Sequence, residues 1–245
     1  MLSIRIIVRK GGVWKVSVIV GMLFLWTAWA EERPLPGAIQ PEELEEFAGL
    51  PQRRKRLVKI SLSETSRLKL GQYLYGSADP ARGGFDCSGS IYYLLRKVGI
   101  QPPRSSRAQF AWLEKKGGLR KVPAETSSLK DPVFRDLRPG DLLFWARIRD
   151  GKVGKVSHVQ MYLGVEKGYG PVMMGSTDGR SYRGKARCGF GVFDFKLPGP
   201  GSRSRFMGYG TPPGLEETEA DKETEADEET EADEETDDPQ STEEE

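Results

Sequence analysis

Hydrophobic positions in the middle of the chain recur with the spacing of helices. From Ile91, apolar residues follow at i+3, i+4 and i+7, which predicts an amphipathic helix over residues 87–98. A second, shorter helix is predicted at 106–116, after the Pro102-Pro103 pair that would end the first one. A further helix is expected around residues 66–74. The first half of the folded part is therefore predicted to be helical.

Strand patterns follow the helices. A Pro139-Gly140 turn leads into Asp141 and the apolar run 142–145, and three more candidate strands lie at 156–165, 172–176 and 190–195. Strands that follow one another without intervening helices are typical of antiparallel pairing. The sequence therefore predicts an α+β domain with a mainly antiparallel sheet.

The beginning of the chain has the composition of an export signal. Basic residues precede the uncharged stretch 16–29, and small residues stand at Ala28 and Ala30, which predicts a secretory signal peptide over residues 1–30. The stretch is short for a membrane span of about 20 residues, so membrane contact is expected only if the segment is not cleaved. The predicted location is periplasmic or secreted, where nucleic acid is not an expected partner.

Segments without hydrophobic periodicity flank the predicted domain. Proline-rich residues 31–65 are interpreted as a linker or lead-in, and the domain is placed at 66–212. Residues 213–245 are predicted to be a disordered acidic tail, because Thr-Glu-Ala-Asp recurs there every six residues with almost no apolar content. The sequence indicates no particular partner for this tail.

Charge is distributed unevenly behind the net charge of +1. Residues 216–245 hold 18 acidic side chains and one lysine, so the rest of the chain is strongly basic. A basic domain favours an anionic partner, and one hypothesis is that the tail competes with an anionic substrate for the domain. Cys87 and Cys188 are the only cysteines, which excludes a disulfide scaffold, and Cys188 is assigned a structural role.

Cys87 stands at the first turn of a predicted helix, after the glycine pair Gly83-Gly84. Unpaired N–H groups and the helix dipole stabilise negative charge at a helix N-terminus, so Cys87 is expected to ionise more readily than a free cysteine. The thiolate is the attacking species in cysteine catalysis. Asp86, directly before it, is interpreted either as a helix cap or as a ligand for a substrate amine.

His158 is the only histidine of the chain and the candidate base. On the predicted strand 156–165, Val159 alternates with His158 and Gln160, so the imidazole faces away from the apolar layer. A cysteine nucleophile needs a base that accepts its proton. Cys87 and His158 together therefore predict nucleophilic catalysis.

Five short motifs occur in order along the chain. They are Tyr73-Leu74-Tyr75-Gly76, Asp86-Cys87-Ser88-Gly89, Arg104-Ser105 with Gln109, Pro139-Gly140-Asp141, and the segment from His158 to Gly164. Together they resemble the NlpC-type cell-wall cysteine peptidases over residues 68–209. The resemblance implies a papain-like fold, in which the cysteine helix packs on an antiparallel sheet that carries the histidine. It also implies hydrolysis of peptidoglycan stem peptides, most often between the γ-carboxyl of D-glutamate and the following diamino acid.

The resemblance assigns roles residue by residue. Cys87 matches the family nucleophile, His158 matches the base, and Tyr73 matches a tyrosine near the oxyanion position. Four further residues match positions in the substrate cleft: Asp86, Ser88, Arg104 and Ser105. In these roles Arg104 would pair with a stem carboxylate and Asp86 would receive an ammonium group.

One position departs from the family pattern. The family usually places a third polar residue, often histidine, on the strand after the base, where it orients the imidazole. Here Met174 is expected at that place. Either Ser176 or Asp178 replaces it through a shifted strand, or a backbone carbonyl or a water does so, or the site is impaired.

This departure keeps two alternatives to the peptidase open. One is a wall-binding scaffold of the same fold with weak catalysis, and the other is a related amidase or acyltransferase that uses the same pair of residues. The sequence contains no metal-ligand cluster and no phosphate-binding loop, so no cofactor and no metal are expected.

Overall fold

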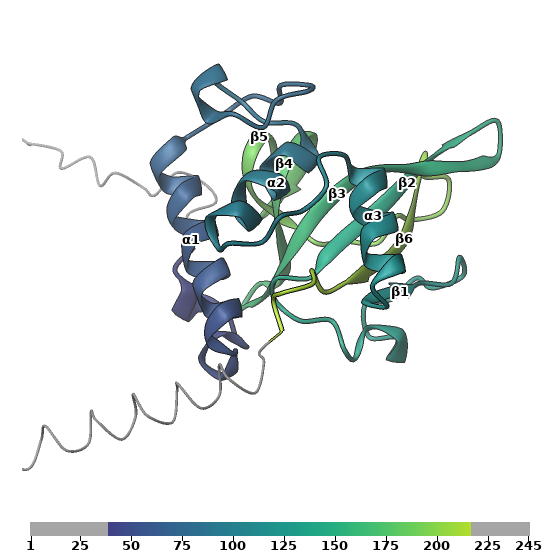
Figure 1. Cartoon of the computed structure of the whole chain (residues 1–245). Coiled ribbons are helices and arrows are strands. Elements are labelled where there is room, and N and C mark those ends of the chain that lie inside the picture. The colour runs from purple at the N-terminus through teal and green to yellow at the C-terminus, as the bar shows by residue number, and fades with distance from the viewer. Residues whose placement is uncertain (1–38, 217–245) are drawn as a thin grey trace, which may run out of the picture. The chain divides into compact units, whose positions relative to one another are not determined.

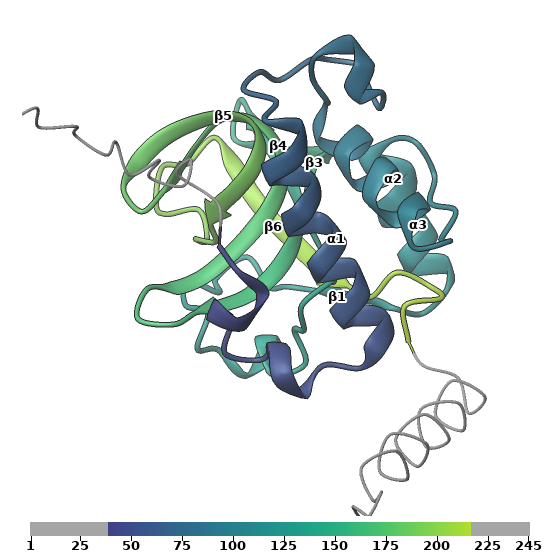
Figure 2. The same ribbon diagram turned by 90° about the vertical axis from the view of Figure 1, so that its left-hand side faces the viewer.

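Helices cover one face of an antiparallel sheet in the computed structural model, which describes residues 39–216 (Figure 1). In the described part three α-helices precede six strands, and Figure 2 shows the helices together on one side of the sheet. The predicted signal peptide, residues 1–30, and the acidic repeats of the predicted tail lie outside the described residues. Among residues 39–216 no helix is both long enough and apolar enough to span a membrane.

The order of the elements agrees with the predicted class. The helices are α1 (Gln52–Leu68), α2 (Cys87–Lys97) and α3 (Ser106–Lys115). The strands are β1 (Leu119–Lys121), β2 (Leu142–Arg149), β3 (Lys152–Glu166), β4 (Gly170–Tyr182), β5 (Lys185–Asp194) and β6 (Ser204–Gly210). They lie in the order β1-β6-β2-β3-β4-β5, with every neighbouring pair antiparallel. The α+β class is confirmed, as is the papain-like packing of the cysteine helix on the strand that carries the histidine.

α2 buries the apolar face that the sequence predicted. Ile91, Leu94 and Leu95 have no exposed surface, and they belong to the same core as Val159 and Met161 of β3. Burying such a side chain stabilises the fold by about 1.5–3 kcal/mol relative to leaving it exposed. The first turn of α2 is therefore held over β3 by a packed core.

Hydrophobic patterning did not predict β1 and β6. A Cβ at Gly208 or Gly210 of β6 would lie 2.2 or 2.1 Å from the carbonyl oxygens of Arg120 and Gly118. The close approach of the two strands therefore requires glycine. Glycine also removes the alternation of side chains by which a strand is recognised.

The helix predicted around residues 66–74 is wrong. α1 ends at Leu68, and Lys69 adopts a left-handed conformation with φ of 49° that closes the helix. The chain then runs to α2 as a loop with one 3-10 turn, Pro80–Arg82. The loop brings Tyr73 beside Phe85, just before α2.

Much of the predicted lead-in, residues 31–65, folds with the domain. α1 begins at Gln52, and Leu57 is fully buried. Before the helix, Leu44 forms a β-bridge with Glu166 at the end of β3. The folded domain thus starts well before residue 66, where the sequence placed its boundary.

A buried ion pair joins α1 to the start of β2. Arg54 Nη1 donates to Asp141 Oδ1 at 2.9 Å and to the Pro139 carbonyl oxygen at 2.8 Å. Thr211 Oγ1 donates to the same Asp141 oxygen at 2.8 Å, and the Arg138 N–H donates to Oδ2 at 3.0 Å. Arg54 and Asp141 are 3 % and 1 % exposed. The Pro-Gly-Asp motif therefore anchors α1 against the sheet.

Asp141→Asn should lower the free energy of unfolding by about 3–5 kcal/mol, because it leaves the Arg54 guanidinium buried without a counter-charge. Urea denaturation followed by circular dichroism measures the change. Asp136→Asn is the matched control: its pair with Arg120 lies on the surface, so a loss of at most about 1 kcal/mol is expected. Equal losses in the two variants would contradict the anchoring role of Asp141.

Candidate active site

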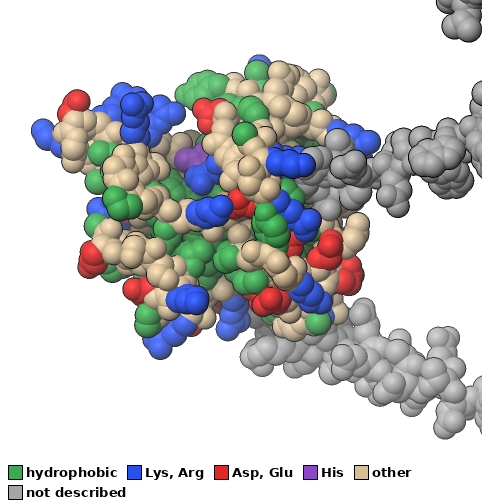
Figure 3. All heavy atoms as spheres, turned by 180° about the vertical axis from the view of Figure 1, so that it is seen from behind, with side chains coloured by type: hydrophobic (Ala, Val, Ile, Leu, Met, Phe, Trp, Pro, Cys, Tyr) green, Lys and Arg blue, Asp and Glu red, His purple; other side chains and the backbone are tan. Residues whose placement is uncertain are grey.

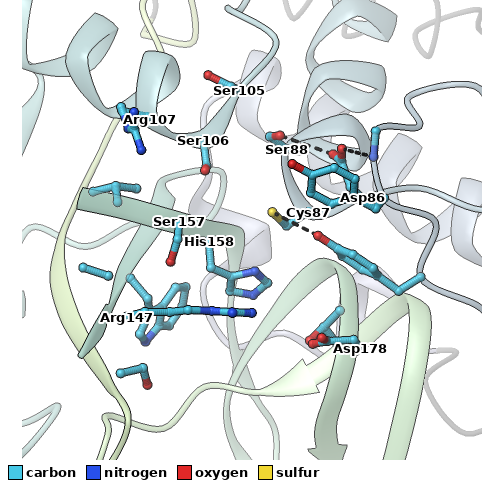
Figure 4. Close-up of a pocket in the computed structure, with 18 of the residues that line it drawn as sticks. Asp86, Cys87, Ser88, Ser105, Ser106, Arg107, Arg147, Ser157, His158 and Asp178 are labelled. Atoms are coloured by element: carbon cyan, nitrogen blue, oxygen red, sulfur yellow. Dashed lines mark hydrogen bonds between the residues drawn. The ribbon is translucent and has the colours of Figure 1, made fainter. Parts of the chain in front are cut away.

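A cleft runs over the N-terminus of α2. It has a volume of about 1070 Å³ and is lined by residues of α2, α3, β2, β3 and β4, among them Cys87 and His158. Figure 4 shows the thiol and the imidazole next to each other in this cleft, one from α2 and one from β3. Two predicted catalytic side chains that are far apart in the sequence are therefore brought together by the fold.

The turn before α2 fixes the position of Cys87. Asp86 caps the helix, since its Oδ1 accepts from the Gly89 N–H at 2.6 Å and its Oδ2 accepts from the Gly76 N–H at 2.9 Å. A Cβ at Gly89 would lie 2.0 Å from the Ser77 carbonyl oxygen. The Asp-Cys-Ser-Gly motif therefore needs its glycine so that α2 can pack against the loop that contains Ser77.

Three predicted cleft residues contact one another. Arg104 donates from Nη1 and Nη2 to Asp86 Oδ1 and Oδ2 at 3.0 and 2.8 Å, a bidentate pair. Its Nη1 also donates to Ser88 Oγ at 3.0 Å. Of the two interpretations of Asp86, the structure shows the helix cap. Substrate contacts of Asp86 and Arg104 stay predictions, since the two groups are already each other's partners.

Tyr73 and Ser105 also lie where the resemblance placed them, on the lining of the cleft. The Tyr73 hydroxyl is 3.7 Å from Cys87 Sγ, and burial raises the pKa of the phenol, so it stays a hydrogen-bond donor. Ser105 is the cap of α3, because its Oγ accepts from the Ala108 N–H at 3.3 Å. Tyr73 can thus act on the reacting atoms directly, whereas Ser105 shapes the cleft through α3.

Burial controls the ionisation of Cys87. The residue is 5 % exposed, and the loss of solvent raises the pKa of its thiol. Hydrogen bonds from the Tyr73 hydroxyl and from the N–H groups of Val159 and Ser88 lower this pKa, but by less. Burial therefore opposes the thiolate that the helix terminus is expected to stabilise.

His158 is also held in its neutral form. One edge of the ring reaches the cleft, but burial, together with the positive charges of Arg180 and Arg147, lowers the pKa of the imidazole to about 3. The ring of Trp145 lies 5.7 Å from the imidazole, and Arg180 lies 4.5 Å from the Trp145 ring centre. Burial thus favours the neutral form of both side chains in the resting site.

Neither residue predicted for the third position contacts His158. Ser176 is fully buried, and its Oγ donates to the Phe85 carbonyl oxygen at 2.7 Å. Asp178 lines the cleft, but no hydrogen bond between the described residues links it to the imidazole. Met174, expected at the third position itself, lies in the main hydrophobic core. The orienting group has to come from elsewhere.

Gln160, which lies two residues after His158 on β3, contacts the imidazole. Its Nε2 lies 3.1 Å from His158 Nε2 and donates to the Ser176 carbonyl oxygen at 3.1 Å. Gly175 on β4 leaves the room for it, since a Cβ there would lie 2.5 Å from Gln160 Oε1. The alternation of β3 places residues 158 and 160 on one face, so the sequence contains this signal, although the family pattern points to the following strand.

Cys188 does not belong to the cleft. It is a free and exposed thiol on β5, so it does not pack as the buried hydrophobe that a structural role would require. Within residues 39–216 no group of three or more histidine, cysteine or acidic side chains is placed to hold a metal ion.

The part of the sequence that builds this cleft is similar to known proteins. Residues 71–179 match the model of the NlpC/P60 family. The gamma-DL-glutamyl hydrolase of Bacillus subtilis (strain 168) is 34% identical over 107 residues, and the bifunctional muramidase/DL-endopeptidase CwlT of the same organism is 29% identical over 92 residues. These matches cover 43% and 38% of this chain. The chain spans only 21% and 22% of the two relatives.

Two solved structures are similar over part of their length. A Staphylococcus aureus protein, described as similar to a lipoprotein of the NLP/P60 family, shares 21% identity at a TM-score of 0.39 and covers 64% of this chain and 41% of its own. NlpC2 from Trichomonas vaginalis shares 18% identity at a TM-score of 0.40 and covers 68% of this chain and 49% of its own.

Proposed function

With residues 71–179 forming a domain of the NlpC/P60 family, we propose that this chain is an exported cysteine peptidase that hydrolyses peptidoglycan stem peptides. The observation that carries the proposal is the pairing of Cys87 with His158 in one cleft, where Gln160 contacts the imidazole. Export rests on the sequence of residues 1–30. The names of the two Bacillus relatives, a gamma-DL-glutamyl hydrolase and a DL-endopeptidase, favour the bond after the γ-carboxyl of D-glutamate.

The neutral resting pair defines the attack step. Cys87 Sγ attacks the scissile carbonyl carbon while its proton passes to Nδ1 of His158, so the sulfur gains its charge only as the carbon–sulfur bond forms. For Nδ1 to be free, the ring proton must be on Nε2, which requires the Gln160 side-chain amide to turn its oxygen toward Nε2. The carbonyl oxygen becomes an oxyanion in the same step. The Tyr73 hydroxyl and the Cys87 backbone N–H are the donors that stabilise it.

Release of the products returns the proton. When the tetrahedral intermediate collapses, the carbon–nitrogen bond breaks and the leaving amine takes the proton from His158, which leaves an acyl thioester on Cys87. Water then attacks the thioester and gives its proton to His158. The second collapse frees the carboxylic acid and restores the thiol. Each turn consumes one water and yields one acid and one amine.

Digestion of purified stem peptides tests the proposal. We expect the chain to convert a tetrapeptide fragment of peptidoglycan into one product that ends at D-glutamate with a free γ-carboxyl and one that begins with the diamino acid. Mass spectrometry identifies both. Retained binding to cell walls without cleavage would instead indicate a wall-binding scaffold, and cleavage confined to other amides or esters would indicate the related amidase or acyltransferase.

Gln160→Ala should lower kcat/KM by about 10²-fold, because the imidazole loses the contact at Nε2 that holds its ring in the reacting geometry. Ser176→Ala is the matched control: its hydroxyl bonds the Phe85 carbonyl oxygen instead of His158, so activity per folded molecule should be close to that of the wild type. A Gln160→Ala value within about twofold of the wild type would contradict the orienting role.

Gln160→Glu distinguishes an orienting contact from a purely structural one. A carboxylate beside Nε2 stabilises the imidazolium, so it should raise the pKa of His158 and move the acid limb of kcat/KM to higher pH. An acid limb that stays where it is in the wild type would show that residue 160 does not contact the imidazole in solution. The pH profile of the hydrolysis rate measures the difference.

A further inference from the structure

Arginines gather around His158. Besides Arg104, which is paired with Asp86, four arginines line the cleft: Arg107 from α3, Arg147 and Arg149 from β2, and Arg180 from β4. These four residues are called the arginine wall below. Figure 4 shows Arg107 and Arg147 on the side of the cleft where Ser157 and His158 lie. In Figure 3 the purple histidine lies in a hollow with basic side chains next to it.

Acidic side chains do not neutralise the arginine wall. Of the two carboxylates that line the cleft, Asp86 is already paired with Arg104. The other is Asp178, whose charge acts on Arg180. In the part of the chain that the structure describes, no side-chain hydrogen bond or ion pair holds the other three arginines. This side of the cleft is therefore strongly cationic.

Proton transfer from His158 to the leaving amine places the amine-side fragment of the substrate next to these arginines. His158 gives its proton to the leaving amine, so the fragment that leaves must lie on the His158 side of Cys87. We infer that the arginine wall is a subsite for carboxylate groups on the amine-side fragment of the substrate. Guanidinium forks bind carboxylates with two parallel hydrogen bonds, which suits this chemistry. The inference rests on the proposed function, from which it takes the side on which the amine leaves.

A carboxylate bound by the arginine wall would also raise the pKa of His158. Arg180 and Arg147 lower the pKa of His158, and an anion held by these two arginines would offset their field. The imidazole then becomes a stronger base when a substrate with the correct charge is in place. The arginine wall would thus couple recognition of the leaving fragment to proton transfer from Cys87.

Alkylation of Cys87 measures the arginine wall without requiring peptidase activity. Iodoacetate carries a carboxylate, iodoacetamide carries a neutral amide, and both react with the same sulfur. In a Cys188→Ser background, Arg107→Gln/Arg147→Gln should lower the ratio of the iodoacetate rate to the iodoacetamide rate about tenfold. In the protein that keeps all four arginines, added salt should lower the same ratio of alkylation rates. Both arginines are exposed, so the double variant should keep its fold.

Two further variants serve as controls for the alkylation ratio. Arg147→Lys keeps the positive charge and should keep most of the preference for iodoacetate. Arg135→Gln removes an exposed arginine that does not line the cleft and should leave the ratio unchanged. A ratio that responds neither to the double variant nor to salt would overturn the inference.

Paired substrates test the arginine wall during turnover. Two stem peptides that differ only in a carboxylate or a carboxamide on the amine-side residue should differ about tenfold in kcat/KM, and the double variant should remove the difference. If neither peptide is cleaved while the alkylation ratio still depends on the arginines, the proposed function fails and the anion subsite stands. If both are cleaved equally well, the subsite fails and the peptidase stands.

Discussion

Cys87→Ala should abolish hydrolysis of stem peptides, with turnover reduced by about 10⁴-fold or more. Without Sγ no acyl thioester can form, and the donors near Tyr73 can then assist only direct attack by water. Cell-wall binding should persist, because the Asp86–Arg104 pair and the arginine wall are unchanged. Mass spectrometry of the released peptides measures cleavage, and co-sedimentation with purified cell walls measures binding.

Two serine substitutions provide further tests of Cys87 as the nucleophile. Cys188→Ser makes the same change at an exposed thiol outside the cleft and should keep full activity. Cys87→Ser keeps the size of the side chain but should be inactive, because an alcohol is a far weaker acid than a thiol and His158 is a weak base. Cleavage that survives both substitutions of Cys87 would refute its assignment as nucleophile.

The meeting of Cys87 and His158 could be predicted because both lie on elements with strong local patterns. α2 has one continuous apolar face around Ile91, and β3 alternates around Val159, so each pattern fixes which way the neighbouring side chains point. The two apolar faces are buried in one core. When the faces pack together, the start of α2 and the middle of β3 come to the same cleft.

α1 could not be recognised in this way, because charged residues lie on its buried side. Arg54 and Glu64 are buried beside Leu57. Arg54 is paired with Asp141, and Glu64 is paired with Lys97 and with Arg67 on the same helix, so two of the three counter-charges are distant in the sequence. A local pattern contains no information about such pairs. The apolar periodicity of α1 is therefore weak, and most of its residues fall in the segment 31–65 that the sequence indicates as a linker or lead-in.

The third position shows a different limit of sequence reasoning. Met174, which the sequence places at the third position, offers no polar group and lies in the hydrophobic core. The loss is compensated in space, because Gln160 from the adjacent strand enters the volume that a side chain at 175 would fill. Single-sequence patterns describe each strand separately, so an exchange of roles between two strands becomes visible only in the packed sheet.

His158→Ala should lower kcat/KM by about 10²–10⁴-fold while leaving the resting reactivity of Cys87 nearly unchanged. In the resting site burial raises the pKa of the Cys87 thiol, and burial with Arg180 and Arg147 lowers the pKa of the imidazole to about 3. Both shifts favour a resting site in which the Cys87 thiol keeps its proton. Removing a base that acts only during the attack slows hydrolysis without changing the resting amount of thiolate.

Two pH profiles separate these roles of His158. The rate of Cys87 alkylation by iodoacetamide, measured in a Cys188→Ser background, should rise with pH up to and beyond the ordinary thiol pKa of about 8.5, equally with and without His158. Hydrolysis by the wild type should keep its kcat/KM well below the ordinary histidine pKa of about 6.5, because its acid limb follows protonation of the depressed imidazole. A plateau of alkylation below about pH 7 that His158→Ala removes would instead demonstrate a resting thiolate–imidazolium pair. In that case the field of Arg147 and Arg180 would be too weak to keep the imidazole neutral, and the base would be charged before the substrate binds.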